Sequence, residues 1–198
     1  ASDVYKRQVE DIGSEDFVSA MNSPGNSQYM MYGYVKGRPL NALWGFKYGG
    51  VWHNQEEIER NKVTNTYVSA TTSLSPGLPR YIDTNNDGSL DQKDLVYLGN
   101  ADPTIYGGLQ NTFNIGQLKV GVYFAYSLGG KIYNYSELYM AGTYSSNQYR
   151  YMANSWHPVR NPDSDLPRAG AVQVHVPSDL QVHDASYLRL KNVSVGYT

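Results

Sequence analysis

Residues 117–126 alternate strictly between bulky apolar side chains and small or polar ones. The apolar side chains stand at the even-numbered positions, which are Leu118, Val120, Val122, Phe124 and Tyr126. The odd-numbered positions include Lys119, Gly121, Tyr123 and Ala125. Successive side chains of a β-strand point to opposite faces of the sheet, so this period predicts a strand with one continuous apolar face. Leu118, Val120, Val122 and Phe124 are expected to face lipid if the strand crosses a membrane, with Lys119 and Tyr123 facing the other way.

Other segments of the chain share this β character. Residues 105–115 are a second strand candidate, and Asn114 with Gly116 is expected to supply the turn of a hairpin with the strand that follows. Four further β-prone segments are 28–36, 43–52, 131–140 and 187–197. Strands of about ten residues are long enough to cross the hydrocarbon of a bilayer when tilted. The fold class predicted is all-β, with antiparallel strands.

One short surface helix is expected among these strands. Asn54 is a capping residue followed by acidic residues suited to a helix N-terminus, and the helix should end near Asn61. Residues 64–75 read as a polar loop. Residues 144–182 carry four prolines and are too broken for regular structure. Long loops of this kind are typical of the extracellular side of outer-membrane barrels.

Composition narrows the class of function. The 16 Lys and Arg residues against 18 Asp and Glu leave no basic surface, so nucleic acid is not an expected partner. The absence of Cys excludes disulfide scaffolds and thiol nucleophiles. Alternation alone does not separate a membrane barrel from a soluble sandwich, since both have one apolar face per strand. The 19 Tyr residues favour the barrel, because aromatic residues gather at membrane interfaces.

Residues 1–8 need separate treatment. The run from Asp3 to Gln8 can be back-translated into a string that resembles the transposase end sequence used in preparing sequencing libraries. This interpretation makes 1–8 a sequencing-adapter artefact, and it leaves 9–198 as part of a barrel domain whose preceding part is missing. The alternative is an ordinary polar N-terminus.

Residues 83–94 carry oxygen-bearing side chains at the spacing of a calcium-binding loop. The six candidate ligands are Asp83, Asn85, Asp87, Ser89 through its carbonyl, Asp91 directly or through water, and Asp94. Gly88 permits the left-handed turn that brings the Ser89 carbonyl to the ion. Asp94 stands where such loops usually have a bidentate Glu, so the loop must close more tightly, as in the dockerin-like loops that it resembles. The Ca²⁺ would be structural, because such a site offers little Lewis-acid chemistry. The alternative is a turn that binds no ion, since Asx turns favour the same residues.

The sequence contains no recognisable catalytic set, so the chain is not expected to be an enzyme. The four histidines have no zinc-site spacing and are interpreted as polar surface residues; they are His53, His157, His175 and His183. The acid pairs Glu56/Glu57 and Asp163/Asp165 are interpreted as solvated, because adjacency in sequence does not give the separation of about 5 to 9 Å that glycoside hydrolysis needs.

Four segments, taken in order, resemble the SusC/RagA-type TonB-dependent outer-membrane transporters. Residues 43–52 and the acidic helix that follows are similar to that family's "YGYKYDGIF…EE" passage. Residues 76–83 with the acidic loop resemble "PGDIKYxDxNGDGxID". Residues 99–113 resemble "GNPxPxxxxGxxNxF", and residues 187–197 resemble "FLRLRNxxLGY". The ordered set spans nearly the whole chain, from about Gln28 to Thr198.

This resemblance implies a function and partners. The family forms a 22-stranded barrel that imports oligosaccharides or peptides across the outer membrane of a Bacteroidetes-type bacterium. It is energised by TonB, which would act through an N-terminal part missing here, and it works with a SusD-like lipoprotein at the extracellular mouth. Outer-membrane lipid is then a further partner. Within the family this chain would be a C-terminal part of the barrel.

Two other classes of function stay open from the residues. The first is a secreted, calcium-stabilised carbohydrate-binding β-module, which would need a closed soluble core and no lipid-facing band. The second is a piece of a glycoside hydrolase, which would need two converging carboxylates in a cleft.

Overall fold

The computed structural model describes residues 8–11, 13, 18–19, 33–61, 64–65, 74–140, 147–170 and 176–197. The strands are β1 (Val18–Ser19), β2 (Gly33–Tyr34), β3 (Ala42–Gly45), β4 (Tyr48–Val51), β5 (Thr64–Asn65), β6 (Pro79–Tyr81), β7 (Ser89–Leu90), β8 (Val96–Asn100), β9 (Ile105–Ile115), β10 (Leu118–Leu128), β11 (Lys131–Tyr133), β12 (Val182–Asp184) and β13 (Tyr187–Tyr197). The helices are α1 (Gln55–Arg60) and α2 (Tyr135–Met140), with 3-10 turns η2 (Gln92–Asp94), η3 (Arg150–Asn154) and η5 (Asp179–Gln181). No helix within the described ranges is long and apolar enough to cross a membrane. The predicted all-β class is confirmed.

The chain divides into two compact units. The larger unit comprises Ala1–Leu98 and Tyr133–Val182, and the smaller one comprises Gly99–Ile132 and His183–Thr198. The smaller unit contains the three longest strands, so we call it the sheet unit. The predicted adapter residues, apart from Gln8, lie outside the described residues, as does most of the predicted strand 28–36. Its described end forms β2, which pairs with β1.

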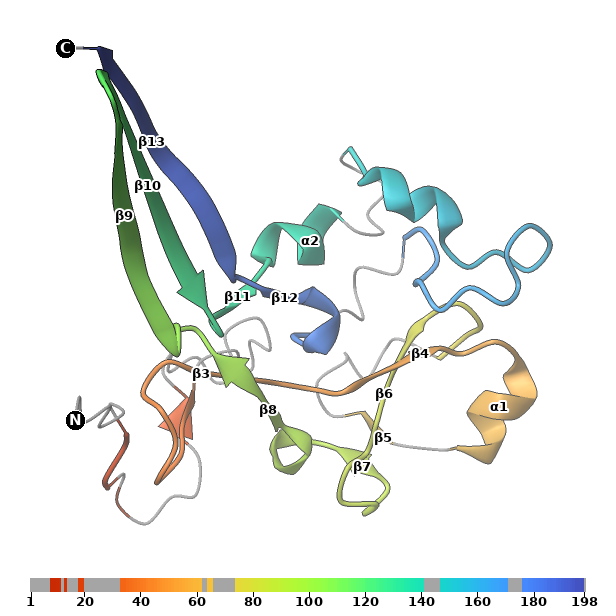
Figure 1. Cartoon of the computed structure of the whole chain (residues 1–198). Coiled ribbons are helices and arrows are strands. Elements are labelled where there is room, and N and C mark those ends of the chain that lie inside the picture. Colours follow the sequence, from red (N-terminus) through yellow and green to blue (C-terminus); the bar gives the residue numbers. More distant parts are fainter. Residues whose placement is uncertain are drawn as a thin grey trace. The chain divides into compact units, whose positions relative to one another are not determined.

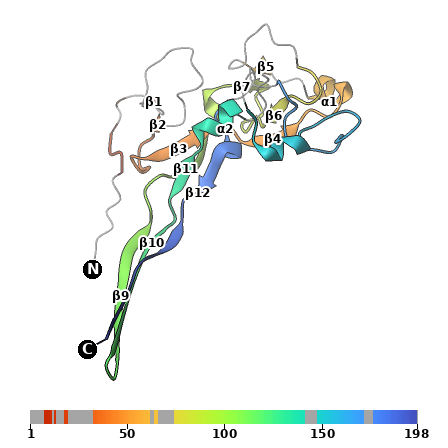
Figure 2. The same cartoon turned by 90° about the horizontal axis from the view of Figure 1, so that it is seen from above.

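The sheet unit is built on one antiparallel sheet in the order β13-β10-β9. Its three strands run side by side in Figure 1 and stay together when the view is turned (Figure 2). The predicted hairpin of β9 and β10 is confirmed, and so is the predicted strand 187–197. The turn differs in detail, because Asn114 lies within β9 opposite Lys119. Gly116, with φ at 62°, and Gln117 make a two-residue turn, which needs positive φ and therefore favours Gly.

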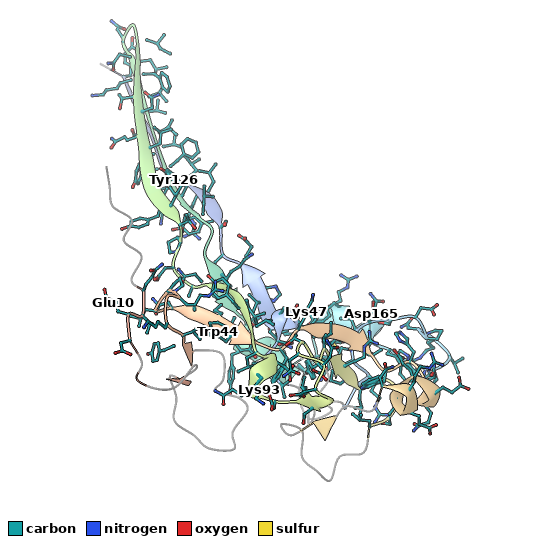
Figure 3. The ribbon with its side chains drawn as sticks, turned by 90° about the horizontal axis from the view of Figure 1, so that it is seen from below. Glu10, Trp44, Lys47, Lys93, Tyr126 and Asp165 are labelled. Carbon is teal, nitrogen blue, oxygen red and sulfur yellow. The ribbon has the colours of Figure 1, made fainter. Side chains whose placement is uncertain are left out.

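The register places the apolar residues of the predicted alternation on one face of this sheet. Leu118, Val120 and Val122 of β10 stand opposite Tyr197, Val195 and Val193 of β13. On the other side Leu118, Val120 and Phe124 face Ile115, Phe113 and Leu109 of β9. The opposite face is polar, and its cross-strand partners include Lys119 with Asn114, Tyr123 with Gln110, and Tyr123 with Asn192. Side chains project from both faces of the sheet, with Tyr126 labelled on β10 (Figure 3). We call these two surfaces the apolar face and the polar face.

A β-bulge in β13 keeps its apolar residues on one face. Leu190 pairs with Phe124 and Asn192 pairs with Tyr123, so Lys191 has no partner across the ladder. In a regular strand Leu190 and Val193 would point to opposite faces, because they are an odd number of residues apart. The extra residue shifts the phase by one. The bulge therefore lets Leu190 share the apolar face with Val193.

The larger unit packs around the predicted segment 43–52. Its core cluster consists of Phe46, Trp52, Ile58, Leu78, Tyr81, Leu90 and Val176. The segment forms two short strands, β3 and β4, instead of one, because Phe46 leaves the first strand to bridge Ser178. Arg80 secures this region, since its guanidinium donates to the Gly49 carbonyl at 2.6 Å and to Glu57 Oε1 at 2.9 Å.

Two helices replace the single one predicted. The helix α1 begins after Asn54, whose side chain accepts from Glu57 N at 2.8 Å, and its C-cap is Asn61, as predicted. The predicted strand 131–140 is wrong beyond Tyr133, because α2 follows. Asn134 precedes this helix and its side-chain oxygen accepts from Glu137 N at 3.3 Å, which favours a helical turn over an extended strand. The described parts of 144–182 contain only η3, η5 and isolated bridges before β12 begins at Val182. The described parts of 64–75 include β5.

Candidate functional site

The predicted loop 83–94 lies between β6 and β8 in the larger unit and curls around its first residue. Asp83 follows β6 closely, and its carboxylate accepts from Asn86 N at 2.7 Å and from Gly88 N at 2.8 Å. Gly88 has φ at 81°, as the loop pattern requires. Asn86 also has a positive φ, of 58°, which the pattern did not predict. The two left-handed residues turn the chain back over Asp83.

A chain of Asx turns continues through the loop. Asn85 Oδ1 accepts from Asp87 N, and Asp87 Oδ1 accepts from Ser89 N, each at 2.9 Å. The Asn85 amide also donates to Asp87 Oδ2 at 3.0 Å. The first half of the loop is therefore held by its own side chains. The second half joins the rest of the larger unit through β7, which pairs in parallel with β5, and through Leu90, which is buried in the core.

Asp94 closes the loop from within, and its side chain is fully buried. Its Oδ1 accepts from Thr84 N at 2.8 Å and from Thr84 Oγ1 at 3.1 Å, while Oδ2 accepts from Asp91 N at 2.9 Å. Burial alone raises the pKa of this carboxyl, but the N–H groups of Asp91, Thr84 and Asn85 outweigh burial and hold the pKa below its ordinary value. Asp94 is therefore held as a carboxylate.

The loop brings the predicted residues together in different ways. The side chains of Asp83, Asn85, Asp87 and Asp94 all accept hydrogen bonds from backbone N–H groups of the loop, but only Asp94 is buried. Asp91 instead caps η2 by accepting from Lys93 N at 2.7 Å. In the part of the chain that the structure describes, no three His, Asp or Glu side chains form a group that could hold a metal ion. The types of oxygen donor and the left-handed turns nevertheless suit a hard cation, because each bonded oxygen keeps a further lone pair.

The polar face of the sheet unit carries a shallow cavity of about 560 Å³. Residues from all three strands line it, and those with polar side chains are Gln110, Thr112, Lys119, Tyr123, Asn192 and Ser194. Its floor includes Gly121, where a Cβ would lie 2.6 Å from Ser194 Oγ. The alternation of the strands predicts this polar lining.

Sequence reasoning missed other residues. Thr84 was not singled out, although it bonds Asp94 through both its N–H and its hydroxyl. Glu57 was interpreted as solvated, but it accepts from His53 N at 3.0 Å and pairs with Arg80. His157 lies in a tight turn of the segment 147–170, which builds a cavity of its own. The predicted histidine His175 lies outside the described residues.

Comparisons with known proteins identify the chain's relatives. No protein-family model matches it. It is 31% identical to TonB-dependent receptor P26 of Formosa agariphila over 97% of its length, and 28% identical to TonB-dependent receptor P3 of the same organism over 82%. The chain spans 19% and 15% of the length of these two relatives. Both are named as receptors, in agreement with the expectation that the chain is not an enzyme.

A solved structure shares the fold. The chain matches a subunit in the structure of the RagAB peptide importer in its "open-open" state with a TM-score of 0.59 and 18% identity. The match covers 96% of this chain and 18% of that one. This match supports the interpretation of the antiparallel sheet of β9, β10 and β13, with its apolar face and its polar face, as part of a β-barrel. The chain is therefore part of a TonB-dependent receptor, with a fold of the SusC/RagA type.

Proposed function

We propose that the protein to which this segment belongs is an outer-membrane importer of oligosaccharides, energised by TonB and working with a SusD-like lipoprotein. The relatives are TonB-dependent receptors, which supports active uptake across the outer membrane. The chain covers only 19% and 15% of their lengths, so we assign transport to the larger protein.

The observation that carries this proposal is the two-faced sheet of the sheet unit. Each of its three strands has 11 residues, which matches the length needed to cross a bilayer at a tilt. The apolar face carries large exposed side chains, such as Leu109 at 61%, Val195 at 68% and Tyr197 at 77% exposure. A soluble sandwich would cover such a face with a second layer, whereas a barrel exposes it to lipid. The polar face would then line the lumen.

We propose that the loop 83–94 binds one structural Ca²⁺. Asp83, Asn85, Asp87 and the Ser89 carbonyl would hold the ion, with Asp94 at the buried end and Asp91 acting directly or through water. The left-handed turns at Asn86 and Gly88 support this assignment. Titration calorimetry on the full receptor, with Asp87→Ala as the comparison, tests it. No heat of binding at millimolar Ca²⁺ favours a turn held by its Asx hydrogen bonds alone.

A peptide is the second candidate substrate. The solved structure with the same fold is named as a peptide importer, which supports this alternative. The polar face does not separate the two substrates, because its amides, hydroxyls and single lysine can bind either one.

Uptake assays separate these candidates. Cells that carry the full receptor are given fluorescent oligosaccharides or peptides, and accumulation is compared with that in cells lacking TonB or lacking the partner lipoprotein. The proposal predicts oligosaccharide uptake that both deletions abolish. Uptake of peptides alone would support the second candidate, and uptake unaffected by the loss of TonB would overturn active import.

A further inference from the structure

The segment 147–170 of the larger unit, together with Pro76, lines a half-open cavity of about 430 Å³ that the proposed function does not use. Figure 1 shows this segment, in cyan and blue, as a short helical coil followed by a loop that returns on itself. Its lining includes Pro76, Trp156, His157, Arg160, Asn161 and Arg168. The volume lies in the range typical of small-molecule sites.

A closed turn fixes one wall of this cavity. His157 and Asn161 exchange two backbone hydrogen bonds, at 3.2 and 3.1 Å. The His157 ring accepts from Val159 N and Arg160 N through Nδ1, both at 3.2 Å, which places the ring proton on Nε2. The Asn161 amide donates to the Ser155 carbonyl at 3.4 Å and leaves its own oxygen as an acceptor. The turn therefore holds the backbone of Arg160 in a defined place at the cavity.

A second part of the cavity lining packs against Gly77. Arg168 N donates to the Gly77 carbonyl at 2.9 Å, and a Cβ at Gly77 would lie 2.9 Å from Arg168 Cδ. The same Cβ would lie 2.4 Å from Cε3 of Trp156, whose side chain is buried. The stem of Arg168 and the indole of Trp156 thus pack against one glycine, and this packing holds the second arginine at the cavity.

Within the described part of the chain, neither the guanidinium group of Arg160 nor that of Arg168 forms an ion pair with a carboxylate. The ion pairs among the described residues involve His53, Arg80 and Lys131 as the basic groups, and neither Arg160 nor Arg168. Among the residues that the structure describes, no Asp or Glu lines the cavity. The nearby Asp165 lies against Gly50 instead, with its Oδ1 at 2.6 Å from where a Cβ would stand. Within the described residues, the Trp156 Nε1–H is also buried without an acceptor. The cavity therefore offers several donors and the positive charges of two solvent-exposed arginines, neither of which is paired with a described carboxylate.

We propose that this cavity binds an acidic group, a carboxylate or a sulfate, of an acidic saccharide. Planar guanidinium groups bind such oxyanions through paired N–H donors, and their hydrogen bonds to charged oxygens are the stronger kind. Asn161, His157 and Ser155 provide further hydrogen-bonding groups for sugar hydroxyls beside the two charges. The compact volume suits one or two sugar units better than a long extended chain. This assignment rests on the proposed import of saccharides and narrows their class.

Direct binding to the purified full receptor tests the proposal. Titration calorimetry compares D-glucuronate with D-glucose, which differs by lacking the charge, and with galactose 6-sulfate. Glucuronate or the sulfated sugar should bind at least about 10-fold more tightly than glucose, and the binding should weaken as salt rises. Arg160→Gln or Arg168→Gln should each lower that affinity by about 10-fold or more, since Gln is a shorter polar side chain that lacks the positive charge. Arg150→Gln, an exposed arginine of η3 outside the lining, is the matched control and should have no effect.

Three outcomes would overturn the proposal. Equal affinity for glucose and glucuronate would remove the charge recognition. Equal binding of inorganic sulfate alone would reduce the cavity to an adventitious ion site. Equal binding of N-acetylglutamate would replace the saccharide by an acidic peptide. Uptake assays keep this test apart from the proposed function. TonB-dependent uptake of acidic oligosaccharides that both variants leave intact would sink the cavity proposal alone, whereas TonB-independent uptake would sink import.

Discussion

Gly77 is the position at which a single methyl group should disturb the larger unit most. Its φ of 84° lies in the left-handed region, so Gly77→Ala incurs a backbone cost of roughly 1 to 2 kcal/mol. The new Cβ would also lie 2.4 Å from Trp156 Cε3, and the buried indole has little room to yield. Overpacking of this kind costs about 1 to 3 kcal/mol. We therefore expect local destabilisation of about 2 to 5 kcal/mol.

Gly37→Ala is the matched control for this variant. Its φ of 75° gives the same backbone cost, but a Cβ there meets nothing within 4 Å. The difference between the two variants therefore isolates the contact with Trp156, and it should amount to about 1 to 3 kcal/mol.

Hydrogen exchange in the full receptor measures both variants. Trp156 N donates to the Leu166 carbonyl and Arg168 N donates to the Gly77 carbonyl, so these amides report opening at Gly77. Arg38 N, which donates to the Val35 carbonyl, reports opening at the control. The Gly77 variant should accelerate exchange beyond the control by about 5- to 150-fold, since 1.4 kcal/mol is a factor of ten. Equal acceleration in the two variants would refute the packing of Trp156 on Gly77.

The remaining predictions concern the bulge and the acidic loop. Deleting Lys191 should leave assembly of the full receptor intact, because Leu190 and Val193 then alternate regularly. Deleting Ser194 should instead impair assembly, by about 2 to 3 kcal/mol for each apolar side chain that it moves off the apolar face. The folded fraction on heat-modifiability gels measures both effects. Asp94→Asn should loosen the loop at pH 7. The measurement is hydrogen exchange with a chelator present to remove Ca²⁺, in which the Thr84 and Asp91 amides should exchange faster than in the wild type. The pKa of Asp94 is lowered in the fold, so its stabilisation is present above its ordinary value of 3.8 and lost as pH falls through the lower folded value. The difference between wild type and variant should therefore vanish in that acidic window, and a difference that persists there would contradict the charged role of Asp94.

Local patterns predicted the sheet unit well, because period-two alternation depends only on neighbouring residues. The hairpin of β9 and β10 and the strand β13 lie where the alternation places them. The change of phase between Leu190 and Val193 is visible in the sequence and could have predicted the bulge. The helix α2 was missed because its tyrosines favour strands, although Asn134 with Glu137 carries a capping signal.

Long-range contacts explain what the sequence did not predict. The turn at Gly88 follows from a local motif, whereas the burial of Asp94 depends on how the loop closes on Thr84. The cavity lined by the segment 147–170 depends on the hydrogen bond from Arg168 N to the Gly77 carbonyl, which joins two residues far apart in the sequence. No periodicity or spacing in the sequence predicts this contact between Gly77 and Arg168, because it depends on how the larger unit packs around its core.

Site-directed labelling of the sheet tests the central claim most directly. Residues 1–198 contain no Cys, and in a full receptor from which any other cysteine has been replaced, a single cysteine is introduced at Val122 on the apolar face or at Thr112 on the polar face. These two residues have nearly the same size and lie on adjacent strands. Each variant of the full receptor is labelled with a fluorophore and reconstituted into lipid vesicles. The account predicts that nitroxide lipids quench the label at Val122 and that aqueous iodide quenches the label at Thr112. Quenching by lipid at Thr112 and by iodide at Val122 would contradict it.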